Sequence, residues 1–275
     1  RGLITKGTLW SATSLIDEKF NSLVVDTHLS SIRAGADVIL TNTFTTRRVR
    51  MVQNQVGDLF QFANQKACEL AIKARELSKK NILIAGSLPA QNDTYQADKR
   101  DQNIIEKDFF DQASIINPYI DFFYLDVISS GREVEVALNA IDKLNKPVLV
   151  GLHLKKNGML PSGETITEIV KKYKNTKWLG VVSACVSLEI IEQTVDELKS
   201  LDIPFGFKAN LWAVEEPLPV HRFNTAGYNE IGKNPNITLG KREITGKVFC
   251  QFAKKISKKG ATILGGCCET DSSHI

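Results

Sequence analysis

Residues 121–154 read DFFYLDVISSGREVEVALNAIDKLNKPVLVGLHL, and this stretch decides the expected architecture. It begins and ends with short apolar runs, Asp121–Ile128 and Pro147–Leu154, which lack the strict polar–apolar alternation of a half-exposed strand. Between these runs, four apolar residues recur at helical spacing: Val134, Ala137, Ile141 and Leu144. A buried strand, a helix and a second buried strand form a βαβ unit, which places both strands parallel in one sheet.

The same alternation continues in both directions along the chain. Five further apolar runs predict strands: Asp37–Thr43, Asn81–Leu88, Trp178–Cys185, Ile203–Leu211 and Ala261–Cys268. Amphipathic stretches separate the runs, and a helix closed by Gly35 is expected before the first strand. No linker or change of composition interrupts the pattern, so we expect residues 1–275 to form a single domain.

Seven parallel strands preceded by a helix fit two α/β folds. An open doubly wound sheet usually carries a glycine-rich phosphate loop, and neither GxGxxG nor GxxxxGK[ST] occurs here. A (β/α)8 TIM-type barrel that lacks its first strand and its last helix explains the leading helix equally well. We therefore expect such a barrel, truncated at both ends, with its gap between the Asp37–Thr43 and Ala261–Cys268 strands.

Composition excludes several classes of protein. Of the 275 residues, 35 are Lys or Arg and 31 are Asp or Glu, a net charge of +4 that predicts no nucleic-acid partner. No apolar run approaches the roughly 18 residues of a membrane span. No signal peptide is visible, and five irregularly spaced cysteines do not suggest a disulfide scaffold, so we expect a reduced, cytoplasmic protein. The oligomeric state is not predicted.

The most informative local motif is Gly265-Gly266-Cys267-Cys268, at the end of the last expected strand. Neighbouring strand residues point to opposite faces, so both cysteines can reach one metal only where the backbone leaves regular extension, which glycines permit. Cys185 also ends a strand, and a barrel would place it on the same rim. Three thiolates with an open fourth position are typical of catalytic zinc. The alternatives are small buried hydrophobic residues or a labile thiol pair.

The other two cysteines and three further residues receive simpler interpretations. Cys68 and Cys250 lie in amphipathic stretches, where we expect core thiols. His28 is expected to pack its helix against a strand, and His153 to end a strand at the rim. Trp212 either packs in the core or stacks on a cationic ligand.

The glycine–cysteine motif, followed by His274-Ile275, resembles the closing motif of the homocysteine S-methyltransferase family, whose domain is a zinc-dependent (β/α)8 barrel. Residues 28–44, HLSSIRAGADVILTNTF, are similar to the family's His…Ala-Gly-Ala-Asp…Thr-Asn-Thr-aromatic segment. Shorter counterparts follow the family's order: Trp10-Ser11-Ala12, Ala85–Leu88, Ser162–Glu164, Cys185 and Ala209-Asn210. The resemblance spans essentially the whole chain.

This resemblance implies roles for individual residues. The ligands of a Zn²⁺ cofactor would be Cys185, Cys267 and Cys268. Asp126 would face the ammonium of homocysteine, and Ser87 would lie near its carboxylate. Asn42 and Asn210 would belong to the substrate site, with Asn210 near the metal when substrate is absent; alternatively, both cap loop backbone.

The implied reaction is zinc-dependent transfer of a methyl group to the thiol of homocysteine, giving methionine. The donor would be an onium compound, first S-methylmethionine or S-adenosylmethionine and then betaine. A methyl-corrinoid donor would require a further module.

Departures from the family pattern keep an alternative open. The family has Glu-Thr where this chain has Asp126-Val127, Asn where it has Ala184, and an opening Asp-Gly-Gly-Met-Gly segment that is absent here. A non-catalytic member that binds zinc or thiols is therefore the alternative function. A zinc hydrolase is disfavoured because hydrolases mostly use histidine and carboxylate ligands.

Overall fold

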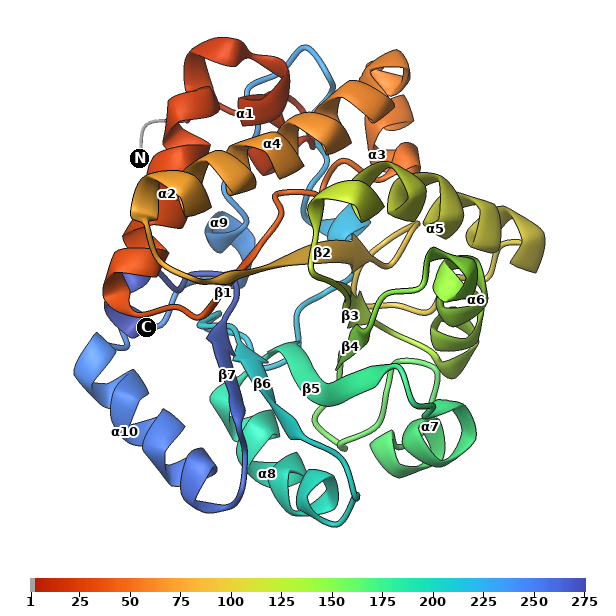
Figure 1. The fold of residues 1–275 in the computed structure, drawn as a ribbon, viewed down its shortest axis with the longest axis vertical. Coiled ribbons are helices and arrows are strands. Elements are labelled where there is room, and N and C mark those ends of the chain that lie inside the picture. The colour runs from red at the N-terminus through yellow and green to blue at the C-terminus, as the bar shows by residue number, and fades with distance from the viewer. Residues whose placement is uncertain (1–2) are drawn as a thin grey trace.

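The computed structural model describes residues 3–275 and contains one curled sheet of seven parallel strands, with helices around its outside (Figure 1). Each strand pairs with the next one along the chain. Their bounds are β1 Val38–Leu40, β2 Leu83–Pro89, β3 Phe122–Ile128, β4 Val148–Leu152, β5 Trp178–Val186, β6 Phe205–Ala209 and β7 Ile263–Gly266. Every strand that the sequence predicts is confirmed, and the parallel order places all the carboxyl ends at one end of the sheet.

Helices connect successive strands and precede the first. The longer ones are α2 Asn21–Ala34, α4 Phe60–Ser78, α5 Gln102–Ile116, α6 Gly131–Ile141, α7 Ile166–Tyr173, α8 Leu188–Lys199 and α10 Gly246–Lys258. Short helices are α1 Thr13–Ile16, α3 Arg48–Gln53 and α9 Asn236–Leu239, with 3-10 turns η1 Trp10–Ala12 and η7 Ser272–His274 among others. Gly35 ends α2 with a φ of 120°, as its place in the sequence predicts. None of the helices in residues 3–275 is long and apolar enough to cross a membrane.

The main core lies between the sheet and the inner faces of these helices. On α10, Phe249 and Phe252 pack edge-on against Phe207 of β6, with ring centroids 6.3 and 5.5 Å apart. Cys68 of α4 is buried, as expected, but the same expectation for Cys250 is wrong because its side chain is exposed. Cys250 follows Phe249 by one residue, a rotation of about 100° that turns it away from the packed face.

The sheet is open between β1 and β7, which are its two edges within the described residues. Residues 3–5, which precede the first helix, do not add a strand to this opening. The residue that follows them, Lys6, instead forms an antiparallel bridge with Ile231. A cavity of about 620 Å³ lies along this opening, and Leu83 and Leu264, which line it, are half exposed. The architecture is thus an α/β barrel of the (β/α)8 type with seven strands and one open seam.

Candidate metal and substrate site

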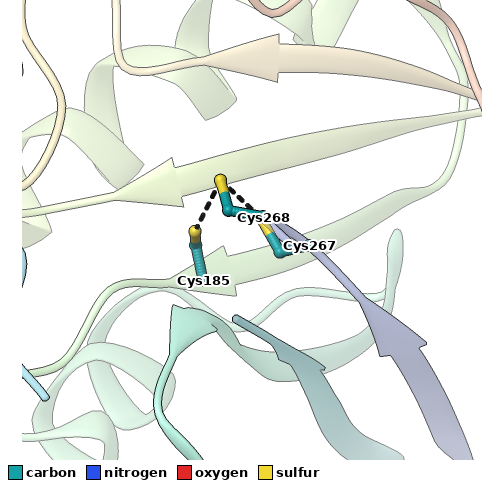
Figure 2. A group of neighbouring side chains, drawn as sticks. All are labelled: Cys185, Cys267 and Cys268. Carbon is teal, nitrogen blue, oxygen red and sulfur yellow. Dashed lines mark hydrogen bonds between the residues drawn. The ribbon is translucent and has the colours of Figure 1, made fainter. Parts of the chain in front are cut away.

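The thiols of Cys185, Cys267 and Cys268 meet at the carboxyl ends of β5 and β7 (Figure 2). The Sγ atom of Cys268 lies 3.7 Å from that of Cys185 and 3.9 Å from that of Cys267, and all three lie within 4.8 Å of one another. Zinc–sulfur bonds of about 2.3 Å in tetrahedral geometry require sulfurs about 4 Å apart. Within residues 3–275, no other group of His, Cys, Asp or Glu side chains converges in this way. The cluster fits a soft metal ion such as zinc.

A tight turn after β7 lets two neighbouring cysteines face the same point. The Cys267 N–H still donates to the carbonyl of Ala209, at 2.7 Å. The Cys267 carbonyl then accepts from both the backbone N–H and the Oγ1 hydroxyl of Thr270, at 3.2 and 2.7 Å. A Cβ on Gly266 would lie 2.3 Å from Thr270 Oγ1. The space around the turn therefore requires glycine at position 266. At Gly265 a side chain would meet no close contact, so the structure does not require glycine there.

The third thiol is held by a distortion of β5. Cys185 has a φ of 54°, and the β5–β6 register shifts between Ala184 and Val186. Asn210, just after β6, donates from Nδ2 to the Cys185 carbonyl at 2.7 Å and thereby supports this geometry. Val127, at the end of β3, also has a positive φ, 62°, which is rare for a β-branched residue. Strained backbone of this kind is concentrated at functional sites.

The thiols interact strongly with one another and with Tyr95, whose hydroxyl lies 3.2 Å from Cys185 Sγ. Burial opposes ionisation of Cys185, but hydrogen bonds from Cys267, Cys268 and Tyr95 outweigh it and lower the Cys185 pKa well below its usual value. The hydrogen bond to Cys185 in turn raises the pKa of Cys267 to about 12, and that of Cys268 also rises. Without a cation, the cluster therefore favours a single shared thiolate; a divalent cation would allow all three thiols to ionise.

A cavity of about 770 Å³ opens beside the thiols at the carboxyl end of the sheet. Of the seven residues that the family resemblance places in the site, six line this cavity together: Asn42, Ser87, Asp126, Cys185, Cys267 and Cys268. Aromatic rings of Trp10, Phe44 and Tyr95 form part of the wall, and sequence reasoning gave these rings no role in the site. Tyr95 lies in the loop after β2, where no local pattern marks it.

Asp126 is 2% exposed, and both of its carboxylate oxygens are engaged. Oδ2 accepts from the Ser87 hydroxyl at 2.9 Å, and Oδ1 lies 2.6 Å from Nζ of Lys208 on β6. Burial raises the pKa of Asp126, and the charge of Lys208 opposes that rise. Burial lowers the pKa of Lys208, but Asp126, together with Cys267 and Tyr124, outweighs this effect and raises it above its usual value. At 2.6 Å the two groups form a charged pair within the barrel. Sequence reasoning missed Lys208, although a lysine in the apolar run Ile203–Leu211 was a usable signal.

The remaining expected residues have mainly structural contacts. Asn42 donates to the Ser11 carbonyl at 3.2 Å, and Asn210 is buried behind Cys185 without lining the cavity. His153 is also buried, with Nδ1 3.3 Å from the Ala184 carbonyl, and burial lowers its pKa to about 4. His28 lines the cavity from α2, and its pKa is likewise lowered to about 4 by burial. Trp212 is 3% exposed and is absent from the cavity wall, which favours its packing role.

Comparison with known proteins supports the fold described above. The chain superimposes on the metallated homocysteine methyltransferase MmuM from Escherichia coli with a TM-score of 0.76 and 18% identity, covering 99% of this chain and 88% of that one. The S-methylmethionine–homocysteine S-methyltransferase BHMT2 of Rattus norvegicus is 23% identical over 282 residues, covering all of this chain and 72% of the relative. Homocysteine S-methyltransferase 2 of Saccharomyces cerevisiae is 22% identical, covering all of this chain and 87% of the relative. The family model for homocysteine S-methyltransferase matches residues 3–275, and the chain therefore belongs to the homocysteine S-methyltransferase family.

Proposed function

We propose that this chain, acting as one domain, uses zinc held by Cys185, Cys267 and Cys268 to transfer a methyl group from an onium donor to the thiol of homocysteine. The observation that carries the proposal is the convergence of three sulfurs, 3.7 and 3.9 Å apart, in the wall of a cavity of about 770 Å³. That volume falls within the usual range for small-molecule sites and can hold an acceptor and a donor together.

The three cysteines supply the soft, anionic donor set that zinc prefers, and they leave its fourth position open to the cavity. When bound, zinc would act as a Lewis acid that lowers the pKa of the acceptor thiol and so provides the nucleophile near neutral pH. The chain's own residues would keep this region dry: Tyr95, Val127 and Val220 form a buried apolar cluster around the thiols. The low polarity of this wall strengthens the electrostatic interactions within the site.

An onium donor suits the aromatic part of the cavity wall, which belongs to the same apolar cluster as the thiols. Trp10 stacks on Phe223, with ring centroids 6.4 Å apart and planes inclined by 16°, and Trp10 and Phe44 both line the cavity. Aromatic faces attract a cationic donor through cation–π interactions. The donor would leave as a neutral molecule, so in-line transfer depends on positioning and needs no general acid. The name of the rat relative includes S-methylmethionine, which supports that compound as the donor. S-adenosylmethionine, also a sulfonium compound, is the second candidate.

All five cysteines of the chain are free thiols. Sulfurs this close together would be prone to oxidation in an oxidising compartment, which supports a cytoplasmic location for the protein.

The direct test is an assay of the zinc-loaded protein with homocysteine and, separately, S-methylmethionine, S-adenosylmethionine and betaine. We expect methionine to form with one of the first two donors, and no product from a Cys185→Ala variant. The alternative function, a zinc- or thiol-binding protein without turnover, is favoured if zinc binds stoichiometrically but no donor yields methionine. Failure to bind either zinc or homocysteine would contradict both functions.

A further inference from the structure

The Lys208–Asp126 pair places a positive charge inside the cavity that would receive the acceptor. Lys208 lies on β6 and Asp126 on β3, so the pair spans the inside of the curled sheet, and both side chains line the cavity that contains the thiols. The Lys208 side chain is only 15% exposed and that of Asp126 only 2%. Neither charge is therefore well solvated.

Lys208 retains unused hydrogen-bond donors, whereas both carboxylate oxygens of Asp126 already accept a hydrogen bond. An ammonium has three N–H donors, and in the described residues Lys208 Nζ uses one of them, toward Asp126 Oδ1. The aromatic ring of Tyr124 lies under the same nitrogen, 5.0 Å from it. Asp126, by contrast, already accepts from Lys208 and from Ser87. The pair thus presents unused donors to the cavity.

This arrangement disfavours a substrate ammonium beside Asp126. Such a group would either displace Lys208, leaving a buried ammonium without a partner, or share the carboxylate with it, bringing two positive charges together. Both outcomes are unfavourable in a buried site. A substrate carboxylate meets the opposite situation, because Lys208 can donate charge-assisted hydrogen bonds to it while still paired with Asp126.

We propose that Lys208 determines acceptor specificity: it binds the acceptor's carboxylate, and an amino group on the acceptor contributes little to binding. This inference rests on the proposed function and refines its acceptor, from homocysteine alone to thiol carboxylic acids in general. 4-Mercaptobutyrate, which is homocysteine without its amino group, should therefore be bound by the same site. 3-Aminopropanethiol, which keeps the ammonium and lacks the carboxylate, should be bound poorly.

The test is titration calorimetry of the zinc-loaded protein with these three thiols. We expect 4-mercaptobutyrate to bind at least as tightly as homocysteine, and 3-aminopropanethiol about 10- to 100-fold more weakly, the worth of one charge-assisted hydrogen bond. In Lys208→Met, binding of 4-mercaptobutyrate should weaken by a similar factor, and 3-aminopropanethiol should bind more tightly because Asp126 is freed. Lys255→Met is the matched control, since Lys255 forms only a surface ion pair with Glu192, and its thiol affinities should equal those of the unaltered protein.

A second variant guards against misfolding, because Lys208→Met leaves a buried carboxylate unpaired. Lys208→Met combined with Asp126→Asn removes both charges and should bind the three thiols with similar affinities. Tighter binding of 3-aminopropanethiol than of 4-mercaptobutyrate by the unaltered protein would overturn the inference and leave the proposed function standing. Absence of binding by any of the three thiols would overturn the proposed function as well.

Discussion

At the scale of single residues, the site depends on backbone irregularities that bring three thiols together. The positive φ of Cys185 and the turn after Gly266 each direct a side chain that regular strand geometry would send elsewhere. Asn210 connects the two features, because it holds the Cys185 carbonyl and lies next to Leu211, whose N–H donates to the Cys268 carbonyl. The convergence of the three thiols is therefore a property of the strand ends and not of the cysteine residues alone.

Replacement of any one thiol should remove the metal. In Cys185→Ala, Cys267→Ala and Cys268→Ala, we expect zinc content, measured by elemental analysis after dialysis, to fall from about one ion per chain to well below that, because two thiolates rarely retain structural or catalytic zinc. Cys250→Ser is the control, since this thiol is exposed on α10 and should not change zinc content. Full zinc content in Cys268→Ala would argue against the three-thiolate site.

Asn210→Ala should weaken the metal site without removing a ligand. The change leaves the Cys185 carbonyl without its 2.7 Å partner and loosens the strained backbone that orients the thiol. Supporting residues of this kind typically affect metal affinity by about 10- to 100-fold. Competition with a chelating dye measures that loss, and an unchanged zinc affinity would show that Asn210 plays no supporting part.

At the scale of elements, the connection from β3 to α6 carries a buried acid. Glu133 lies in the first turn of α6, where the hydroxyl of the N-cap residue Ser130 donates to Glu133 Oε2 at 2.6 Å. Burial raises the pKa of Glu133 from 4.5 to about 7. Between these values the folded chain holds a proton that the unfolded chain has released, so this group's contribution to stability is fully present below about pH 4.5 and is lost as the pH rises to about 7.

Glu133→Gln should remove that pH dependence. The free energy of unfolding of the variant, relative to the unaltered protein, should increase by up to about 3 kcal/mol between pH 4.5 and pH 8, since one pKa unit corresponds to 1.36 kcal/mol. Urea titrations of both proteins at several pH values give this difference in the free energy of unfolding. The buried histidines contribute equally to both proteins, so their contribution cancels in the difference. Glu192→Gln, on the exposed side of α8, should show no such trend, and a flat difference for Glu133→Gln would contradict the assignment.

The elements themselves were largely predictable from the sequence, while the contacts between distant elements were not. Buried parallel strands are continuously apolar and Gly35 terminates a helix, and these are local properties that a sequence displays. The pairing of Lys208 with Asp126 depends on where β6 and β3 face each other across the barrel, which no local pattern encodes. The prediction that Asp126 faces a substrate ammonium did not take into account that Lys208 already pairs with this carboxylate. Cys250 was misplaced because α10 buries a narrower face than its apolar residues suggested.

At the scale of the whole molecule, the metal would join two parts of the open barrel. Cys185 is the last residue but one of β5, while Cys267 and Cys268 follow β7, the strand at one edge of the sheet. A barrel without a seam has no free edge, whereas here β7 pairs only with β6 in the described residues. A bound ion would therefore link β7, an edge strand within the described residues, to the inner strand β5.

Removal of the metal should lower the thermal stability of the whole chain. Free zinc at about 1,000 times its dissociation constant stabilises the folded state by about 4 kcal/mol, which corresponds to roughly 10 °C in a protein of this size. Differential scanning calorimetry with and without a chelator should show this shift. The midpoint of Cys185→Ala should be insensitive to chelator, and an equal shift in that variant would mean that the metal binds elsewhere.

The most direct test of the central claim is X-ray absorption spectroscopy at the zinc edge, before and after homocysteine is added. Our account predicts three sulfur ligands at about 2.3 Å and one lighter ligand in the resting protein, and four sulfur ligands once the acceptor thiol occupies the open position. A spectrum dominated by nitrogen or oxygen ligands, or a sulfur count that does not change when homocysteine is added, would contradict the account.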